Sequence, residues 1–184
     1  MIKIPPLEQE KIKLMPYNMN EDNYIISLHN QANAVVFDDV ERNSISNFKN
    51  RIKQSIETDT LGWACWLKEP TVKLGIVYFS HVIPGISALF HFILDINAYK
   101  DYIKSNGNVK FRIMDESARL VISYLFSALQ LQRITGQYFT YNRLAINFCK
   151  KLGFKEEGII RQGTKVSGQP VDIMILGLLR NELI

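Results

Sequence analysis

The segment that decides the fold reads Asn142-Arg-Leu-Ala-Ile-Asn-Phe-Cys-Lys-Lys-Leu-Gly-Phe154 and continues through Lys-Glu-Glu to Gly158. Its apolar residues recur at three- and four-residue steps and share one helical face: Ala145, Phe148, Cys149 and Leu152. Asn142 can cap the free amides at the helix start, and Gly153 can end the helix in the left-handed conformation. The pattern predicts a short capped helix that leads into a strand near Phe154.

Strands are expected on both sides of this helix. Arg133–Thr140 precedes it, and a strand pair, Phe154–Arg161 and Val171–Leu179, follows it. Gly163 and Ser167-Gly168 are expected in a long turn between the paired strands.

The middle of the chain predicts three strands and then a helix. Segments rich in β-branched and aromatic residues are separated by turn signals and predict an antiparallel meander: Gly62–Leu67, Lys73–His81 and Ile86–Leu94. An irregular connection is expected over Asp95–Asn108. From about Arg112 the helical period returns, with an apolar stripe formed by Met114, Ala118, Val121, Leu125 and Ala128.

The first sixty residues predict one strand and two helices. Lys11–Met15 is typical of a short strand ended by Pro16. Asn20 is a suitable N-cap for a helix whose apolar residues are Tyr24, Ile25, Leu28 and Ala32. The second helix is indicated by Ile45, Phe48, Ile52 and Ile56.

The resulting order is β, α, α, β, β, β, α, β, α, β, β. An antiparallel meander followed by a β-α-β-α-β run predicts an α/β fold, with one mixed sheet and helices on both faces. No linker or internal repeat divides the sequence, so residues 1–184 are expected to form a single domain.

Composition narrows the function classes. The 184 residues are 47% hydrophobic and 22% charged, with a net charge of +4, which is typical of a globular protein with a buried core. The small basic excess is scattered, so nucleic acid is not an expected partner. The longest apolar stretch, Leu120–Leu131, is too short to cross a bilayer, so no membrane partner is expected either. Only Cys65 and Cys149 are present, which favours a reducing, cytoplasmic setting.

Several common catalytic motifs are missing from the sequence. It contains no G-x-G-x-x-G after a strand, no G-x-x-x-x-G-K-S/T and no G-x-S-x-G. His29, His81 and His91 are widely separated and lack the spacing of metal ligands, so no metal is expected.

The segment from Asn142 to Gly158 resembles the fourth-helix motif of the GNAT acetyltransferase superfamily. In that motif an Asn is followed by a small residue, a basic pair and Gly-Phe. A strand then begins with an acidic residue and Gly. The element order is similar to the GNAT order, and Val171–Leu176 with Arg180–Glu182 resembles the last strand and tail of that family. The resemblance is closest to the branch that acetylates ribosomal-protein amino termini.

The resemblance implies a splayed central sheet, with acetyl-CoA bound where Ile86–Leu94 and Arg133–Thr140 part. Strand backbone would pair with the pantetheine arm, and the amino end of the third helix would hold the pyrophosphate. The cofactor-binding residues implied are Phe92, Ile93, Leu94, Lys110, Phe111, Arg112, Ile113, Met114 and Asn142. For Asn142, helix capping and ligand contact both stay open.

The sequence departs from the family in its pyrophosphate loop. The family pattern is Gln/Arg-x-x-Gly-x-Gly/Ala, whose glycines let backbone N–H groups approach phosphate. The corresponding positions here are Gly107, Lys110 and Arg112, so neither loop glycine is present. Three interpretations stay open: Lys110 and Arg112 bind the diphosphate through their side chains, the fold has lost the cofactor, or the two cations are ordinary solvated surface.

A second departure concerns acid–base chemistry. Many GNAT enzymes place a proton-donating Tyr four residues before the Gly of Gly-Phe, and Cys149 occupies that position here. Cys149 is a candidate proton donor, or else a small buried hydrophobe; Tyr138 and Tyr141 are nearby substitutes. His91 is the candidate base, because histidine titrates near neutral pH, or else a core or surface residue.

Two functions follow as hypotheses. The first is an acyl-CoA-dependent N-acetyltransferase that uses acetyl-CoA and acts on a primary amine, either a small molecule or a protein N-terminus. The alternative is an inactive GNAT-fold protein with a binding, structural or assembly role, for instance phage-encoded and virion-associated. A homodimer or a larger protein assembly is compatible with both.

Overall fold

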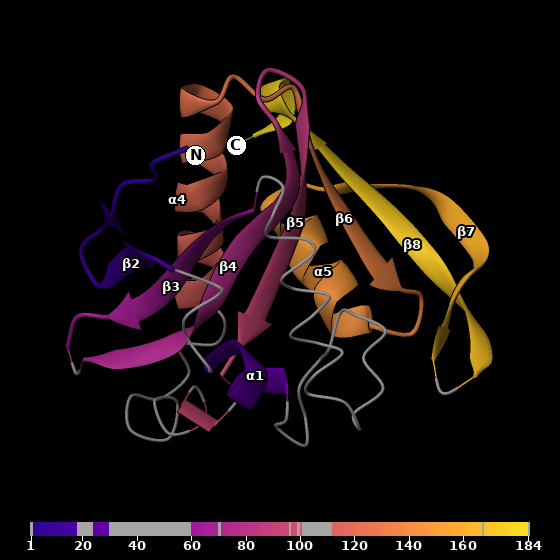
Figure 1. Ribbon diagram of the computed structural model, residues 1–184, viewed down its shortest axis with the longest axis horizontal. Helices are drawn as coiled ribbons and strands as arrows, with labels where there is room; N and C mark the ends of the chain where they lie inside the picture. Colours follow the sequence, from indigo (N-terminus) through magenta and orange to yellow (C-terminus); the bar gives the residue numbers. More distant parts are fainter. Residues whose placement is uncertain are drawn as a thin grey trace.

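The computed structural model describes residues 2–17, 24–29, 60–69, 71–95, 97–98, 100, 112–166 and 168–183. Its strands form one eight-stranded sheet in the order β1-β2-β3-β4-β5-β6-β8-β7 (Figure 1). The strands are β1 Leu7–Glu8, β2 Ile12–Pro16, β3 Leu61–Leu67, β4 Val72–Ile83, β5 Ser87–Leu94, β6 Arg133–Phe139, β7 Lys155–Val166 and β8 Gln169–Leu179. The described helices are α1 Tyr24–His29, α4 Arg112–Ala128, α5 Arg143–Leu152 and the 3-10 helix η1 Arg180–Glu182.

The sheet is mixed, as the sequence predicts. Neighbouring strands pair antiparallel everywhere except between β5 and β6, which run parallel. The expected meander is confirmed as β3, β4 and β5, and α4, β6 and α5 follow in the predicted order. The sequence did not indicate β1, whose two residues pair with Leu14 and Lys13 of β2.

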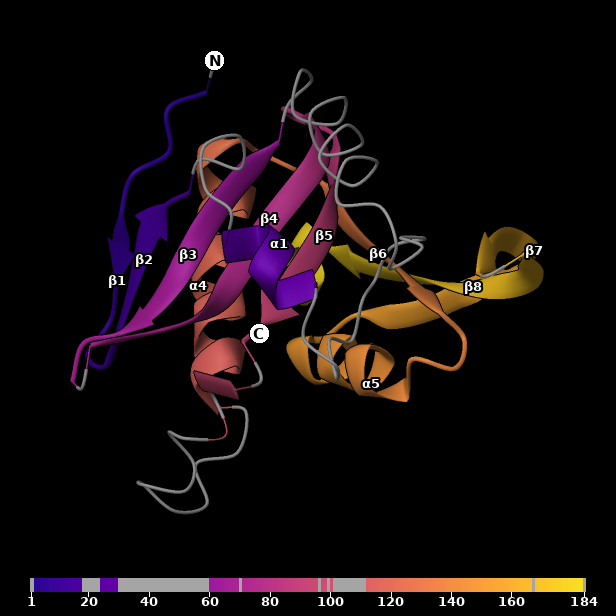
Figure 2. The ribbon, with the colours of Figure 1, turned by 60° about the horizontal axis from the view of Figure 1, so that its bottom comes forward.

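Helices cover both faces of the sheet, which also agrees with the prediction. Trp63 of β3, Val77 of β4 and Phe92 of β5 lie directly opposite one another in register and therefore share a face. On this face Trp63 contacts Tyr124 of α4 with ring centroids 5.9 Å apart, and Phe92 contacts Phe148 of α5 at 4.4 Å. The helix α1 lies in front of β4 and β5, with α4 behind the sheet (Figure 2).

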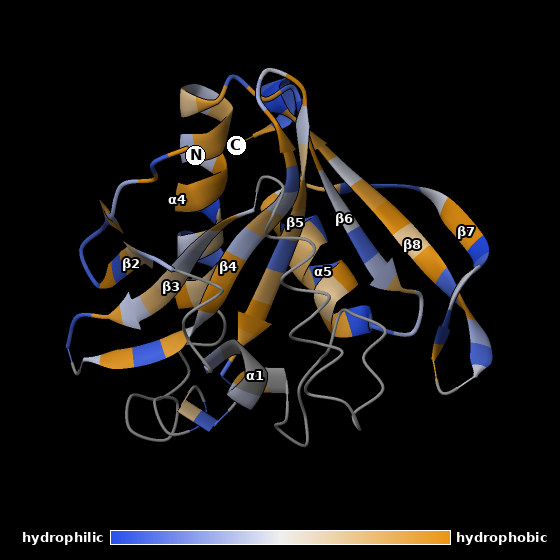
Figure 3. Ribbon diagram, viewed as in Figure 1, coloured by the Kyte–Doolittle hydropathy of each residue, from blue (hydrophilic) through white to orange (hydrophobic). Residues whose placement is uncertain are grey.

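The core lies between the sheet and the α4–α5 layer. Figure 3 shows hydrophobic residues along β5, β8 and α4. The largest fully buried side chains include Trp63, Phe79, Phe90 and Tyr138. Burial of several aromatic side chains, each contributing about 2–3 kcal/mol relative to exposure, accounts for a stable layer here.

The hairpin β7–β8 differs from the prediction. The expected long turn from Gly163 to Pro170 is wrong, because β7 continues to Val166 and β8 begins at Gln169. Gly163 instead lies within an irregular part of the ladder between Ile160 and Thr164. The paired segments on both sides of this irregularity, Lys155–Ile160 and Thr164–Val166, carry the strand through it.

The predicted capping of α5 is confirmed. The Asn142 side chain accepts a hydrogen bond from the Ala145 amide at 3.3 Å. Gly153 adopts φ 105°, and its amide donates to the Lys150 carbonyl. The next residue, Phe154, is buried and begins the return to the sheet.

Parts of the prediction lie outside the described residues. They include the whole second helix, Ile45–Ile56, and most of the connection expected over Asp95–Asn108. Of the helix expected to start at Asn20, the structure describes the segment Tyr24–His29.

Replacing Gly153 tests the helix stop. An alanine in the left-handed conformation costs about 1–2 kcal/mol, so we expect Gly153→Ala to lower the free energy of unfolding by that amount, measured by urea denaturation. Gly158→Ala is a matched control, because an added Cβ there meets no atom within 4 Å. Its effect should stay within about 0.5 kcal/mol. Equal losses in both variants would contradict the cap assignment.

Candidate active site

The two parallel strands β5 and β6 part after three residue pairs. Their pairing joins Ser87 to Arg133, Ala88 to Ile134 and Leu89 to Thr135, and it ends there. Beyond this point β5 continues to pair with β4, and β6 continues to pair with β8. Figure 1 shows the two strands diverging. We call this place the fork; it is formed by residues 90–94 of β5 and 136–139 of β6.

The β5 side of the fork offers backbone rather than side chains. Phe92 and Ile93 are buried, and Leu94 is half-buried against the core. Phe92 packs on Phe148 of α5. If the predicted cofactor residues of β5 contact a ligand, they do so through main-chain groups, as strand-like pairing requires.

The predicted pyrophosphate site is described only from its helical part onward. Lys110 and Phe111 lie outside the described residues, and α4 begins at Arg112. The side chains of Ile113 and Met114 are buried in the core. At the start of α4 these two residues therefore offer a ligand their backbone groups and not their side chains.

Cations gather near the first turn of α4. Asp115 forms ion pairs with Arg119 at 3.3 Å and with Lys151 of α5 at 3.2 Å. The start of a helix itself favours anions. Sequence reasoning missed both cations: Arg119 lies one helical turn from Asp115, whereas Lys151 reaches Asp115 only because α5 packs near the start of α4.

His91 belongs to a polar cluster on β4 and β5. Its Nε2 lies 2.8 Å from the Ser80 hydroxyl, and that hydroxyl lies 3.2 Å from Nδ1 of His81. The His91 ring stacks on Tyr78 with centroids 4.5 Å apart and planes at 8°. Ser80 is buried and His81 is exposed, so the serine hydroxyl links the half-buried imidazole to the surface.

His81 lies at a backbone irregularity in β4. The register of β4 shifts between Ser80 and Ile83, and His81 adopts φ 50° at this point. Bulges of this kind re-aim a side chain without ending the strand. Spacing along the sequence gave no signal for the contact between Ser80, His81 and His91.

Tyr138 and Cys149 meet inside the fold. The Cys149 thiol donates to the Tyr138 hydroxyl at 3.1 Å, and that hydroxyl donates to the Phe90 carbonyl at 3.4 Å. Burial raises the pKa of Cys149 to about 12. Burial, followed by the proximity of Cys149, raises the pKa of Tyr138 well above its usual value. Both groups therefore keep their protons at neutral pH.

Asn142 is buried at the start of α5, with its side-chain oxygen bonded to the Ala145 amide. This contact confirms the capping interpretation. Contact with a ligand stays a prediction for Asn142.

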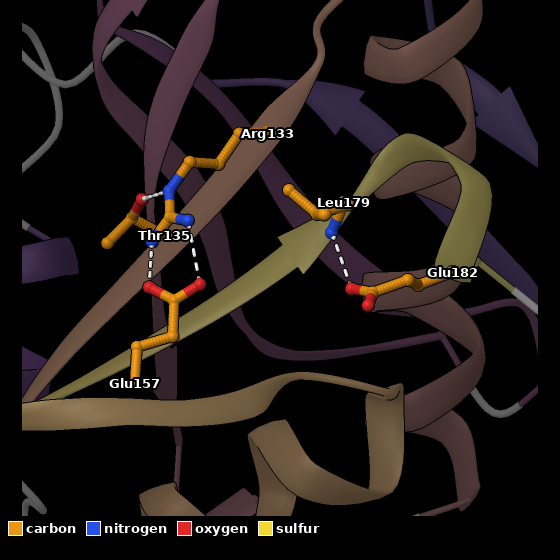
Figure 4. A network of polar contacts seen from close by, with 5 residues as sticks. All are labelled: Arg133, Thr135, Glu157, Leu179 and Glu182. Atoms are coloured by element: carbon orange, nitrogen blue, oxygen red, sulfur yellow. Dashed lines mark hydrogen bonds and ion pairs between the residues drawn. The ribbon is translucent and has the colours of Figure 1, made fainter.

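A charged network braces the strands on the β6 side of the fork (Figure 4). The Arg133 guanidinium bonds both carboxylate oxygens of Glu157 in β7, one of them at 2.7 Å, and its Nε donates to Thr135 at 2.8 Å. The pair crosses over Gly177 of β8, where an added Cβ would collide with the Glu157 carboxylate. The network therefore ties the paired part of β6 to β7.

The described residues hold neither a metal-binding cluster nor a membrane-spanning helix. Among them, no three His, Cys, Asp or Glu side chains are grouped closely enough to bind a metal ion. None of their helices has the length and apolar character to span a membrane.

Part of the sequence is similar to bacterial N-acetyltransferases. The probable N-acetyltransferase YjcK of Bacillus subtilis is 37% identical over 97 residues, which cover 52% of this chain and 54% of that protein. The chain thus matches about half the length of this curated relative. No family model matches the sequence.

Comparison of structures identifies the GNAT fold. Spermidine N-acetyltransferase from Vibrio cholerae, solved with CoA and spermine, superposes with a TM-score of 0.73 and 17% identity, covering 94% of this chain and 97% of that one. Ribosomal-protein-S5-alanine acetyltransferase from Vibrio fischeri gives 0.70 and 18%, covering 98% and 100%. The fold and the sequence matches confirm the resemblance to the GNAT superfamily.

The ion pair of Glu157 predicts a pH-dependent contribution to stability. The hydrogen bond from Arg133 lowers the pKa of the Glu157 carboxyl below its ordinary value. A lowered folded pKa means that the stabilisation is present above the unfolded pKa, about 4.3, and is lost as pH falls through the folded value.

We therefore expect Glu157→Gln to reduce the free energy of unfolding at pH 7 by less than about 1 kcal/mol, because the pair is partly exposed. The difference from wild type should shrink progressively below about pH 4. Urea midpoints at several pH values measure it. A difference that is independent of pH would contradict the carboxylate's role.

Proposed function

We propose that this chain, which has the GNAT fold, is an N-acetyltransferase that moves the acetyl group of acetyl-CoA to a primary amine. The observation that supports this most directly is the fork, where parallel pairing ends after Leu89 and Thr135 although both strands continue. The acceptor is an amine-bearing small molecule or a protein N-terminus. Among the structural neighbours, one was solved with CoA and spermine and another is named for a ribosomal protein.

The residues of the fork fit an extended acyl-CoA arm. The backbone of Phe92, Ile93 and Leu94 would align with the arm as one more strand. The amino end of α4, with the backbone of Arg112, Ile113 and Met114, would face the diphosphate. Lys110 and Phe111 precede it in the sequence and lie outside the described residues. Asn142, at the start of α5, is a further proposed ligand contact. Because the loop glycines are missing, side-chain cations have to supply much of the diphosphate binding.

His91 is the proposed general base. An attacking amine must lose a proton, and histidine is suited to accept one near neutral pH. The hydrogen bonds from His91 through Ser80 to exposed His81 offer a path by which the proton reaches solvent. Positioning of the amine against the thioester would contribute the larger part of the rate.

One observation favours a second candidate, an inactive GNAT-fold protein that binds or assembles with another protein. The pyrophosphate loop has Lys110 and Arg112 where the family pattern has glycines. Loss of acetyl-CoA binding is the simplest consequence of losing backbone contacts to phosphate.

Thermal unfolding with increasing acetyl-CoA separates the two candidates. Ligand at about 100 times its dissociation constant stabilises a protein by roughly 2.7 kcal/mol, which raises Tm by several degrees at this size. We expect a saturable rise with acetyl-CoA and desulfo-CoA but not with ATP, and a smaller rise in the double variant Lys110→Ala, Arg112→Ala. No rise at millimolar acetyl-CoA would favour the binding role.

Replacing His91 tests the proposed base. General-base catalysis typically contributes about 10²–10⁴-fold, so we expect His91→Gln to lower kcat by at least tenfold. Its affinity for acetyl-CoA, measured by calorimetry, should stay within twofold of wild type. The rise of kcat with pH should be lost in the variant, because the titrating base is gone. A wild-type pH profile in the variant would assign the base elsewhere.

A further inference from the structure

The face of the sheet that carries His91 continues across the fork onto β6. His91 lies two residues beyond Leu89, and Leu89 pairs with Thr135 of β6, so these three residues share a face. The same alternation along β6 places Phe139, four residues beyond Thr135, on this face as well. The proposed base on β5 and Phe139 on β6 therefore lie on the two sides of the fork, on one face of the sheet.

Apolar side chains extend this face from β6 over β8 to β7. Phe139 pairs with Ile173 of β8, and Ile173 pairs with Ile160 of β7, so the three residues share the face. An added Cβ at Gly163 would lie 3.0 Å from side-chain atoms of both isoleucines, so their side chains lie close together. The ring of Tyr141 stacks on Phe139 with centroids 5.3 Å apart. We call these four side chains the apolar strip: Phe139, Tyr141, Ile160 and Ile173.

The apolar strip is partly open to solvent. Tyr141 is 61% exposed and Ile160 is 48% exposed, whereas Ile173 is half-buried and Phe139 is buried. Among the described α-helices, α1 is the one on this face, and it lies in front of β4 and β5 (Figure 2). Adjoining apolar side chains that stay exposed on a surface mark a place where another molecule binds.

The width of the apolar strip matches a single apolar group. The strip crosses the neighbouring strands β6, β8 and β7. Neighbouring strands lie about 4.8 Å apart, so the strip is about 10 Å wide. One phenyl or branched alkyl group covers most of that width, whereas a specific protein interface buries about 800 Å² on each partner. The dimensions therefore favour a small molecule.

The charges along β7 disfavour a ligand that carries several positive charges. Arg161 follows directly after Ile160 and is exposed. Both acidic residues of β7, Glu156 and Glu157, are already in ion pairs with cations of this chain. A polycation would therefore meet like charge and no surplus carboxylate along β7, which is described throughout.

We propose that the apolar strip binds the body of the acceptor, and that the acceptor is a small monoamine whose carbon chain carries one apolar group. This inference rests on the proposed acetyl transfer and on His91 as its base. With the apolar group on the strip, the amine nitrogen would lie over the fork, on the face that carries His91. The nitrogen bonds to the thioester carbon, and the surplus amine proton passes to His91. CoA leaves as its thiolate, which takes a proton from solvent. Binding of the apolar group would hold the amine in position for this attack.

The test first compares three amines as acceptors for wild type: 2-phenylethylamine, ethylamine and spermine. The first two share the primary amine and differ by the phenyl ring, whereas spermine is a polycation. We expect kcat/KM for 2-phenylethylamine to exceed that for ethylamine by about 30-fold or more, because burial of the ring favours binding. We expect it to exceed that for spermine by about tenfold or more.

Variants of the apolar strip then locate the preference. Ile160→Ala removes an exposed side chain of the strip, and Ile86→Ala, the matched control, removes one that is 58% exposed at the turn before β5. We expect Ile160→Ala to lower kcat/KM for 2-phenylethylamine about three- to tenfold and to leave that for ethylamine within about twofold. Tyr141→Ala should act in the same way, whereas Ile86→Ala should leave both values within about twofold. Tm and the affinity for acetyl-CoA check that each variant is folded.

The outcomes separate this inference from the proposed function. If wild type binds acetyl-CoA but acetylates spermine or ethylamine as well as 2-phenylethylamine, the inference is overturned and acetyl transfer stands. Equal losses for both amines in Ile160→Ala and Tyr141→Ala overturn it too, because binding of the phenyl ring is then not what the strip supplies. If acetyl-CoA binds and none of the three amines is acetylated, the inference is overturned, and a protein N-terminus is left as the acceptor of the proposed function. If wild type does not bind acetyl-CoA, the proposed function fails and the inference fails with it.

Discussion

Three residue pairs form the whole parallel ladder between β5 and β6: Ser87–Arg133, Ala88–Ile134 and Leu89–Thr135. Each strand then relies on its other neighbour, β4 or β8, to satisfy its hydrogen bonds. The two halves stay in one core because α5 contacts both strands, β5 through Phe148 and β6 through Cys149. Phe148 packs on Phe92, and Phe154 stacks on Phe90 with centroids 5.6 Å apart. A sheet can therefore open locally without losing the layer beneath it.

The fork has different chemistry on its two faces. On the α5 face, Tyr138 and Cys149 are buried and keep their protons, so they suit hydrogen-bond donation. On the opposite face, His91 is connected through Ser80 to solvent, which suits a group that exchanges protons. The fork thus has a buried hydroxyl on one face and an imidazole connected to solvent on the other. These side chains come from four elements: β4, β5, β6 and α5.

Local sequence signals predicted most of the described elements. Asn142 and Gly153 marked the ends of α5, since capping depends on the residue type at one position. The hydrophobic period located α4 and the meander. The errors lay where long-range pairing outweighs local turn signals, as in the part of β7 beyond Gly163, where Thr164–Val166 pairs with Gln169–Val171 of β8. The two-residue strand β1 is too short to leave a periodic signal.

The sequence by itself determined the order of the elements, the capped helix α5 and the absence of familiar phosphate-binding glycines, because these depend on neighbours along the chain. Only the tertiary structure decided which polar groups meet. Cys149 is a plain apolar-face residue in the helical pattern, yet packing of α5 on β6 places its thiol 3.1 Å from the Tyr138 hydroxyl. Likewise, a bulge in β4 brings His81 to Ser80 and so to His91. Such contacts depend on strand register and on the packing of helices against the sheet, and neither leaves a trace in residue spacing.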